Sequence, residues 1–197
     1  NYLVIDHPPD NLLKLVKKHA DTSFQKPIHP ASQKAFHDAE IWLKAQNKPI
    51  ILDLGCGTGM STAHLARDNP DCAILGIDRS AARLSRATTD EADNVLLLRA
   101  DCVDFCRLAL EKNWPVKQLY FFYPNPYPKY TDITKRWHGH PIFPTLLALS
   151  QHIEVRSNWP LYLKEFALAA KTLKPVTTEL TEIKTTANEA ISLFEKK

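Results

Sequence analysis

Short apolar runs alternate with helical patterns along most of the chain. The apolar runs cover residues 50–54, 72–77, 95–98, 119–123 and 153–155, and helical spacing follows near residues 61–67, 81–87, 103–110 and 161–170. This alternation is typical of a parallel sheet with helices on both faces. It predicts an α/β fold whose ligands bind at the carboxyl ends of the strands.

The two ends of the chain follow a different pattern. Residues 11–19 and 31–46 have helical spacing and come before the first strand. We therefore predict an N-terminal helical extension over residues 1–47 and a second domain over residues 48–197. In the tail, apolar residues fit a helix, but the many threonines favour a strand, which we place near residues 176–183.

Composition limits the class of protein only loosely. The chain has 197 residues with 44% hydrophobic and 24% charged side chains, as expected for one globular domain. A net charge of +3 is mildly basic and does not by itself require nucleic acid. The four cysteines form no Cys-x-x-Cys pair, and no apolar run is long enough to cross a bilayer. We expect a cytoplasmic protein with reduced thiols; the oligomeric state stays open.

A glycine-rich loop follows the first apolar run. Gly55, Gly57 and Gly59 lie in the segment GCGTG and allow a tight turn with bare backbone beside a ligand. The dinucleotide fingerprint G-x-G-x-x-G would need a glycine at Met60, and no Gly-Lys-Ser/Thr follows for a phosphate loop. The loop therefore indicates a different nucleoside ligand.

Three aspartates stand where such a ligand needs them. Asp53 lies beside the loop and can meet an ammonium group, directly or through water. Asp78 ends the second run, where a carboxylate can accept both ribose hydroxyls. Asp101 follows the third run and can accept from an adenine amino group. Each also fits a helix N-cap, and for Asp101 the two interpretations have equal weight.

A Pro-rich segment follows the fourth apolar run. Residues 124–129 read PNPYPK, and Lys135, Arg136 and Trp137 come shortly after. Cationic side chains contact phosphates and aromatic rings stack on bases, so this combination suits RNA.

The segments LDLGCGTG, GID and RAD resemble the first three motifs of the class I methyltransferases that use S-adenosylmethionine. The resemblance implies a Rossmann-like fold with a mostly parallel seven-stranded sheet and S-adenosylmethionine as the cofactor. It also implies that Arg79, Cys102 and Tyr123 join the loop glycines and the three aspartates in binding that cofactor. Cys102 is also four residues before Cys106 on a predicted helix, which suits a core residue.

The Pro-rich segment resembles the tRNA (guanine-N7) methyltransferase family, whose pattern is Pro-Asp-Pro-Trp-Pro-Lys followed by a basic stretch. The segments RSNWPLYLKEF at 156–166 and SLFE at 192–195 resemble two later motifs of that family. The resemblance implies tRNA as partner and guanine N7 as target. It implies substrate contacts by six residues: Lys129, Arg136, Arg156, Asn158, Ser192 and Glu195.

Two departures from that family change the chemistry of the expected pocket. Asn125 and Asn158 stand where the family has aspartate. Guanine N7 is an in-plane lone pair and needs no deprotonation, so a neutral Asn125 can still orient the base and is our candidate catalytic residue. The alternatives are a methyltransferase of another substrate, such as the amino-group enzymes with Asn-Pro-Pro-Tyr, and a non-catalytic module that binds RNA or protein.

Two further features are open. His138 and His140 are two residues apart but match no standard zinc spacing, so we expect a polar or phosphate-facing loop and no metal. The resembled family continues with another strand after the region matching 192–197, and its connection into the fifth strand carries glycines that this sequence lacks. One interpretation is that the natural protein has further residues near 150 and after 197.

Overall fold

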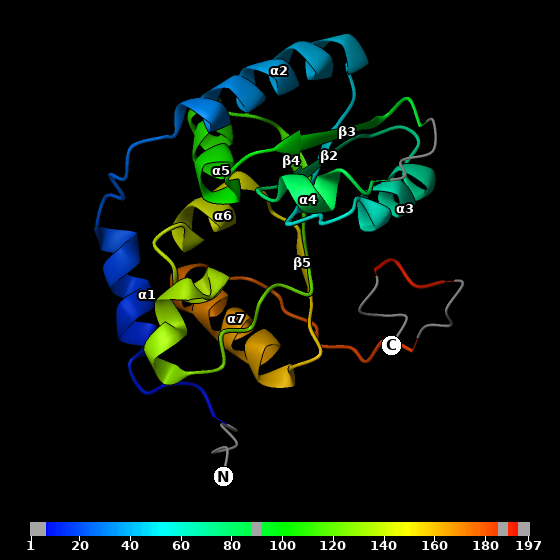
Figure 1. The fold of residues 1–197 in the computed structure, drawn as a ribbon. Helices are drawn as coiled ribbons and strands as arrows, with labels where there is room; N and C mark the ends of the chain where they lie inside the picture. Colours follow the sequence, from blue (N-terminus) through cyan, green and yellow to red (C-terminus); the bar gives the residue numbers. More distant parts are fainter. Residues whose placement is uncertain (1–6, 88–91, 185–188, 193–197) are drawn as a thin grey trace. The chain divides into compact units, whose positions relative to one another are not determined.

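The central sheet consists of strands whose side chains are largely buried. The computed structural model describes residues 7–87, 92–184 and 189–192. Within these residues five strands occur in the order β3-β2-β1-β4-β5 (Figure 1): β1 Ile50–Leu54, β2 Ala73–Asp78, β3 Val95–Arg99, β4 Val116–Phe122 and β5 Ile153–Arg156. Every residue of β1 and β2 is buried. This explains their continuous apolar pattern, since a parallel sheet is covered on both faces.

The helices begin and end at residues that suit those positions. Pro30 and Pro160 start α2 and α7, where a missing N–H costs nothing. Asp101 caps α5, and Asn47 ends α2 in the left-handed conformation. The α-helices are α1 Leu12–Asp21, α2 Pro30–Gln46, α3 Met60–Asp68, α4 Ala81–Leu84, α5 Cys102–Glu111, α6 Phe143–Leu149 and α7 Pro160–Leu173, and the 3₁₀ helices are η1 Tyr130–Lys135 and η2 Trp137–Gly139.

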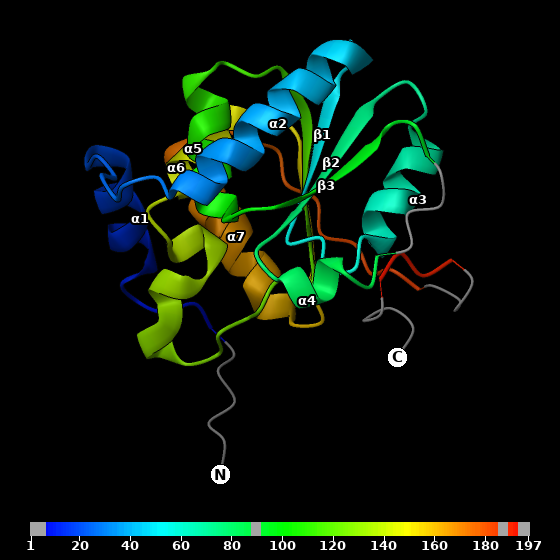
Figure 2. The ribbon, with the colours of Figure 1, turned by 45° about the horizontal axis from the view of Figure 1, so that its top comes forward.

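The chain forms two compact units, each assembled from separate segments. The sheet unit comprises the described residues of 27–122, 149–155 and 183–197, and the helical unit those of 1–26, 123–148 and 156–182. In the sheet unit, β1 pairs in parallel with β2 and β4, and β2 with β3. Helices α2 and α5 cover one face of these strands and α3 the other (Figure 2).

Aromatic packing holds α2 against α5 in the sheet unit. The ring of Phe36 stacks on Trp114 at 4.4 Å between centroids and meets the edge of Phe105 at 5.2 Å. In the helical unit, α1 packs against α7 and η2, with Leu12 and Val16 as its buried residues. The two helices before β1 therefore belong to different units, and the domain boundary at 47/48 stays a prediction.

The sequence predictions about the sheet are confirmed in part. The described residues contain five strands, so the predicted count of seven is not confirmed. The strand predicted near 176–183 is wrong, since residues 175–184 form neither helix nor strand. The expected alternation of strands and helices over residues 50–170 is confirmed. Across the described residues, no helix is both long and apolar enough to span a membrane.

Candidate active site

The glycine loop of the sheet unit connects β1 to α3. Gly55, Gly57 and Gly59 have φ angles of +76°, +60° and +78°, a region that glycine enters without steric cost. The backbone N–H groups of Gly55 and Cys56 donate to the carbonyl oxygen of Ile77 at 2.8 and 3.1 Å. The loop is therefore fixed to the end of β2 by its own backbone.

One side of this loop is open. A Cβ atom placed on Gly55 or on Gly57 would have no neighbouring atom within 4 Å. By contrast, a Cβ on Gly76 in β2 would lie 2.6 Å from the side chains of Leu97 and Thr62. Gly76 thus serves close packing, while Gly55 and Gly57 present bare backbone to space that a ligand can occupy.

Asp53 places a buried carboxylate beside the loop. Its Oδ2 accepts hydrogen bonds from Ser61 Oγ at 2.6 Å and Thr62 Oγ1 at 2.8 Å. Its Oδ1 has no partner among the described residues, although the side chain is fully buried. Burial raises the pKa of Asp53 from 3.8 to about 6. A buried oxygen without a partner is costly, so this carboxylate suits a cationic or hydrogen-bonding ligand group.

Asp78 braces the same loop from the end of β2. Its Oδ2 accepts from the Gly57 N–H at 2.9 Å, and its Oδ1 from the Ser80 N–H at 2.8 Å and Arg83 Nη2 at 2.9 Å. The adjacent Arg79 is exposed. The predicted ribose contact of Asp78 therefore requires a ligand to replace some of these bonds.

Asp101 and Cys102 start α5. Asp101 Oδ1 accepts from the N–H groups of Val103 and Asp104 at 2.8 and 3.1 Å, which confirms the N-cap interpretation. Cys102 Sγ lies 3.6 Å from the Ile77 carbonyl oxygen, and burial raises the pKa of its thiol to about 12. All four cysteines are free, and the pKa of Cys56 is also raised by burial, so neither thiol behaves as a nucleophile.

The Pro-rich loop of the helical unit has an unusual backbone. Tyr123 and Tyr127 have φ angles of +52° and +44°, which is rare for aromatic residues. Asn125 is exposed, and its Oδ1 accepts from the Tyr127 N–H at 3.2 Å. Because a backbone N–H can only donate, this bond identifies the side-chain oxygen, and Nδ2 remains as a donor without a partner among the described residues.

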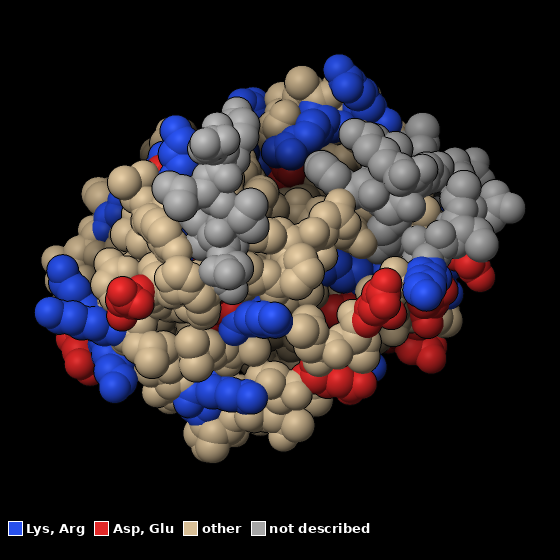
Figure 3. Space-filling model, turned by 90° about the horizontal axis from the view of Figure 1, so that it is seen from below, with Lys and Arg blue, Asp and Glu red and all other residues tan. Residues whose placement is uncertain are grey.

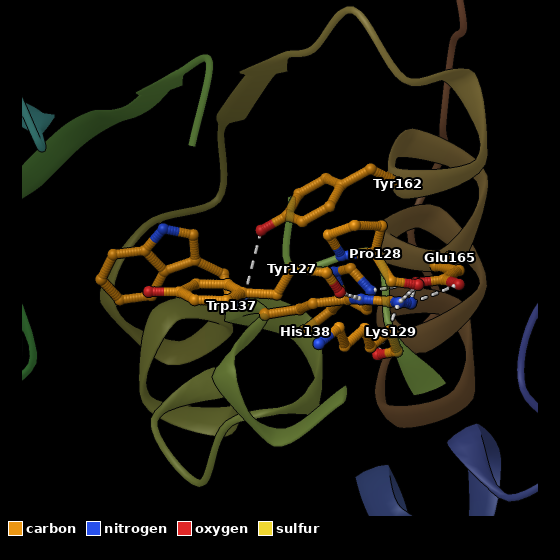
Figure 4. A network of polar contacts seen from close by, with 8 residues as sticks. Tyr127, Pro128, Lys129, Trp137, His138, Tyr162 and Glu165 are labelled. Carbon is orange, nitrogen blue, oxygen red and sulfur yellow. Dashed lines mark hydrogen bonds and ion pairs between the residues drawn. The ribbon is translucent and has the colours of Figure 1, made fainter. Parts of the chain in front are cut away.

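Arg136 holds the same loop from within the protein. Figure 4 shows several residues of this network of polar contacts, among them Tyr127, Lys129 and Glu165. The Arg136 side chain is fully buried, and Nη1 contacts both carboxylate oxygens of Glu165 at 2.7 and 2.6 Å. Nε donates to the Tyr127 carbonyl oxygen at 3.0 Å, and Nη2 to those of Pro128 and Lys129 at 3.2 and 3.4 Å. These bonds occupy all five N–H donors of a guanidinium. These partners all lie within the protein, and the predicted contact of Arg136 with substrate stays a prediction.

Glu165 also binds His138. The Nε2 atom of His138 lies 2.6 Å from Glu165 Oε2, and both side chains are fully buried. Burial lowers the pKa of His138, so the ring is neutral near pH 7 and Nε2 is the donor. Figure 4 shows Glu165 on α7 beside Lys129 and Pro128. Sequence reasoning missed Glu165, although it lies within the segment 156–166 that resembles a family motif.

The other predicted substrate residues are less constrained. In the helical unit, Lys129 and Asn158 are exposed, and the Arg156 carbonyl oxygen accepts from the Tyr123 N–H at 2.8 Å. In the sheet unit, Ser192 Oγ is buried and has no hydrogen-bond partner among the described residues. Glu195 lies outside the described residues. Sequence reasoning also missed Ser61 and Thr62, which lie in the first turn of α3, just after the glycine loop.

The two histidines of the His-Gly-His segment serve different contacts. His138 binds Glu165, whereas His140 Nδ1 accepts from the Ile142 N–H at 3.0 Å. Within the described parts of the chain, no group of three potential metal ligands occurs.

On the face shown in Figure 3, Lys and Arg side chains stand in separate groups with uncharged surface between them. Individual cations, and not one broad patch, are therefore the candidates for phosphate contact on that face.

Comparison with known proteins identifies the family. A family model described as "Putative methyltransferase" matches residues 47–194. This range includes the glycine loop, the three aspartates and the Pro-rich segment. The chain therefore belongs to this methyltransferase family.

Two curated relatives show how far the likeness extends. A tRNA (guanine-N(7)-)-methyltransferase of Christiangramia forsetii is 37% identical over 86 residues, covering 42% of this chain and 38% of that protein. A trans-aconitate 2-methyltransferase of Deinococcus radiodurans is 43% identical over 51 residues, covering 26% and 20%. The matches thus span well under half the length of these relatives.

The chain is also similar to solved structures of methyltransferases, at lower sequence identity. The aminoglycoside resistance methyltransferase NpmB1 has 16% sequence identity and a TM-score of 0.49, with 68% of this chain and 78% of that chain covered. The strand order and glycine loop described above define the Rossmann-like fold independently of that likeness.

Proposed function

We propose that this chain transfers a methyl group from S-adenosylmethionine to N7 of guanine in tRNA. The observation that carries this proposal is the Pro-rich turn at residues 124–129, which exposes Asn125 and Lys129 and contains or adjoins the two tyrosines with positive φ. Its sequence resembles the tRNA (guanine-N7) family, and several curated relatives bear that name at 27–37% identity. Because the matches cover only part of these relatives, the substrate is proposed on chemistry as well as likeness.

The glycine loop fits S-adenosylmethionine. The partnerless Oδ1 of Asp53 would accept from the ammonium group, and the open faces of Gly55 and Gly57 would receive the amino-acid portion. Asp78 would accept the ribose hydroxyls, and Asp101, with Oδ1 used by its cap, would offer Oδ2 to the adenine amino group. Arg79 and Cys102 are the neighbours proposed to line this site. When bound, the cofactor supplies an electrophilic methyl group.

The side chain of Asn125 has one hydrogen-bond donor available for a base. Its Oδ1 is engaged by Tyr127, so the side chain presents the Nδ2 donor. The Hoogsteen edge of guanine carries two neighbouring acceptors, O6 and N7. A donor on O6 would orient N7 and leave its lone pair free for methyl transfer. Tyr123 and Tyr127 would provide stacking surfaces, and the chemistry would rest on positioning without a general base.

The remaining contacts would come from charged and polar groups. Lys129 is exposed on the Pro-rich loop and suits a phosphate. Asn158 is exposed at the start of α7 and would offer an amide to the base, with Arg156 close to it in sequence. Ser192 and Glu195 stay proposed substrate residues on the resemblance alone. tRNA is the proposed partner.

The geometry of Asn125 favours this proposal over an amino-group methyltransferase. In that chemistry an asparagine carbonyl accepts from the target amine, whereas here the carbonyl already accepts from Tyr127. A module without catalytic activity remains the other alternative. It would bind RNA or cofactor and yield no methylated product.

The direct test is incubation of the protein with labelled S-adenosylmethionine and unfractionated tRNA, followed by mass spectrometry of the nucleosides. We expect labelled 7-methylguanosine. Label in another nucleoside would correct the target, and cofactor binding without labelled tRNA would support the non-catalytic alternative.

Variants at position 125 test the role of the amide. Both Asn125→Ala and Asn125→Asp are expected to lower transfer to N7, because both remove the Nδ2 donor. Asp can still accept from the Tyr127 N–H and thus preserves the turn. Full activity in both variants would show that Asn125 is structural, and a higher rate with Asp would refute the donor assignment.

A further inference from the structure

The fully buried Arg136 connects two segments that we have assigned to substrate binding. It binds three consecutive carbonyl groups of the Pro-rich loop, at Tyr127, Pro128 and Lys129. Its guanidinium also lies over the ring of Trp159 at 5.1 Å, next in sequence to Asn158. Through Glu165 it is joined to the second turn of α7. One side chain therefore spans both segments of the helical unit.

The backbone of Tyr127 shows why the loop needs such support. Its φ of +44° is unfavourable for an aromatic residue and persists only where the surroundings fix it. The Tyr127 N–H is held by Asn125 Oδ1, and the Tyr127 carbonyl oxygen by Arg136 Nε. Both backbone polar groups of Tyr127 are thus fixed. The Asn125 amide and the Tyr127 ring share this constraint.

Glu165 makes the burial of Arg136 possible. Its two oxygens neutralise the guanidinium, and His138 donates a further hydrogen bond to Oε2. Tyr162 closes the same region, because its hydroxyl accepts from the Trp137 N–H at 3.2 Å and its ring meets His138 at 4.7 Å between centroids. A lysine has three donors and a single point charge, so it cannot replace the planar five-donor group at position 136.

We propose that Arg136 and Glu165 are positioning residues, which hold the Pro-rich loop and the start of α7 in the arrangement that binds the target base. This inference rests on the proposed function for its catalytic consequence. It is an alternative to the sequence prediction that Arg136 itself contacts the substrate. Arg136 and a phosphate-binding lysine should therefore respond differently to salt and to conservative substitution.

The test compares Arg136→Lys and Glu165→Gln with Asp38→Asn, a carboxylate-to-amide control in the exposed Lys34–Asp38 pair on α2. Circular dichroism and urea unfolding establish that each variant folds. Hydrogen exchange of the backbone amides of Asn125, Tyr127, Lys129 and Tyr130, measured by mass spectrometry, reports the loop without any substrate. We expect exchange about tenfold faster in both test variants and unchanged in the control.

Kinetics then separate positioning from phosphate binding. With tRNA as substrate, we expect kcat to fall by about a hundredfold in Arg136→Lys, because misplacement of the base disrupts alignment. The salt dependence of tRNA binding should stay as in the unaltered protein. Lys129→Ala, by contrast, should make tRNA binding less dependent on salt. The slope of log affinity against log salt concentration should fall by the amount expected for about one lost phosphate contact.

Two results would overturn the proposal. The first is wild-type exchange in both Arg136→Lys and Glu165→Gln. The second is a reduced salt slope with unchanged kcat in Arg136→Lys, which would make Arg136 a phosphate ligand. If the unaltered protein methylates no tRNA, the proposed function fails, and the exchange measurement alone then decides whether Arg136 and Glu165 hold the loop.

Discussion

Among the described residues, each unit has one carboxylate side chain without any solvent exposure, but the two differ in their hydrogen-bond partners. In the helical unit, Glu165 is neutralised by Arg136 and receives a third hydrogen bond from His138. In the sheet unit, Asp53 receives two hydroxyl hydrogen bonds on one oxygen and none on the other, and it forms no ion pair among the described residues. Both side chains have zero exposure.

This difference agrees with the two roles that we propose, in which Glu165 serves the fold and Asp53 binds the cofactor. A buried ion pair whose hydrogen bonds are all made compensates the burial of its two charges. Removing one member leaves the other charge buried without a partner. A buried carboxylate with an unsatisfied oxygen reduces stability until a donor arrives. Burial alone therefore does not identify a functional acid.

The largest effect is expected from breaking the compensated pair. Glu165→Leu should lower the free energy of unfolding by about 3–5 kcal/mol, because Arg136 is left buried without a counter-charge. The double variant Arg136→Met/Glu165→Leu should recover most of that loss. Urea unfolding followed by circular dichroism measures both. As a control, Asp38→Ala in an exposed pair should change stability by less than about 0.5 kcal/mol. Equal losses in the single and double variants would contradict this account.

A pH titration of stability examines the uncompensated acid. The pKa of Asp53 is raised from 3.8 to about 6, so between these values the folded protein holds a proton that the unfolded chain has released. The contribution of Asp53 to stability should therefore fall as pH rises from about 4 to about 6, by roughly 3 kcal/mol, and stay constant above. Asp53→Asn should remove this component. The test is to measure the free energy of unfolding of both proteins at several pH values. Parallel curves of free energy against pH would show that Asp53 does not cause the pH dependence.

Cofactor binding tests the acid that braces the loop. Asp78→Ala should weaken binding of S-adenosylhomocysteine by about 1.5–3 kcal/mol, which is roughly ten- to a hundredfold in affinity. Part of this loss reflects the Gly57 N–H, which loses its acceptor. Calorimetry gives the affinity, with the exposed Asp71 just before β2 as the matched control in Asp71→Ala. Equal affinity in both variants would remove Asp78 from the cofactor site.

The smallest effect on stability is expected at the open glycine. Gly57→Ala introduces a methyl group that meets no atom within 4 Å, so only the φ of +60° opposes it. We expect a loss of about 1–2 kcal/mol in stability. Affinity for S-adenosylhomocysteine should fall further than this backbone strain explains, because the methyl group enters the proposed ligand space. Thermal unfolding and calorimetry on the same samples compare the two losses; unchanged affinity would place the ligand elsewhere.

The sequence was sufficient for the features that depend on local pattern. Alternating apolar runs and helices, the glycine loop and the N-cap of Asp101 were all readable, because each depends on a few neighbouring residues. The strand predicted at 176–183 failed because its threonines gave β-propensity without a pairing partner, and propensity is weaker than tertiary context.

The sequence did not predict the role of Arg136, and the reason is different. A Lys-Arg pair in a Pro-rich segment has the same sequence signal whether it faces a phosphate or a buried glutamate 29 residues later. Only folding brings Glu165 and three carbonyl groups around the guanidinium. The orphaned oxygen of Asp53 was hidden in the same way, since a sequence does not show which lone pairs remain unused.

The turn made by Asn125 has an evolutionary consequence. Its oxygen accepts from the Tyr127 N–H, and the carboxylate of an aspartate can make the same bond. A lineage can therefore exchange amide for acid at this position while keeping the backbone of the loop. The outward atom then changes from donor to acceptor, so the preference for a base edge can diverge among relatives that share one scaffold.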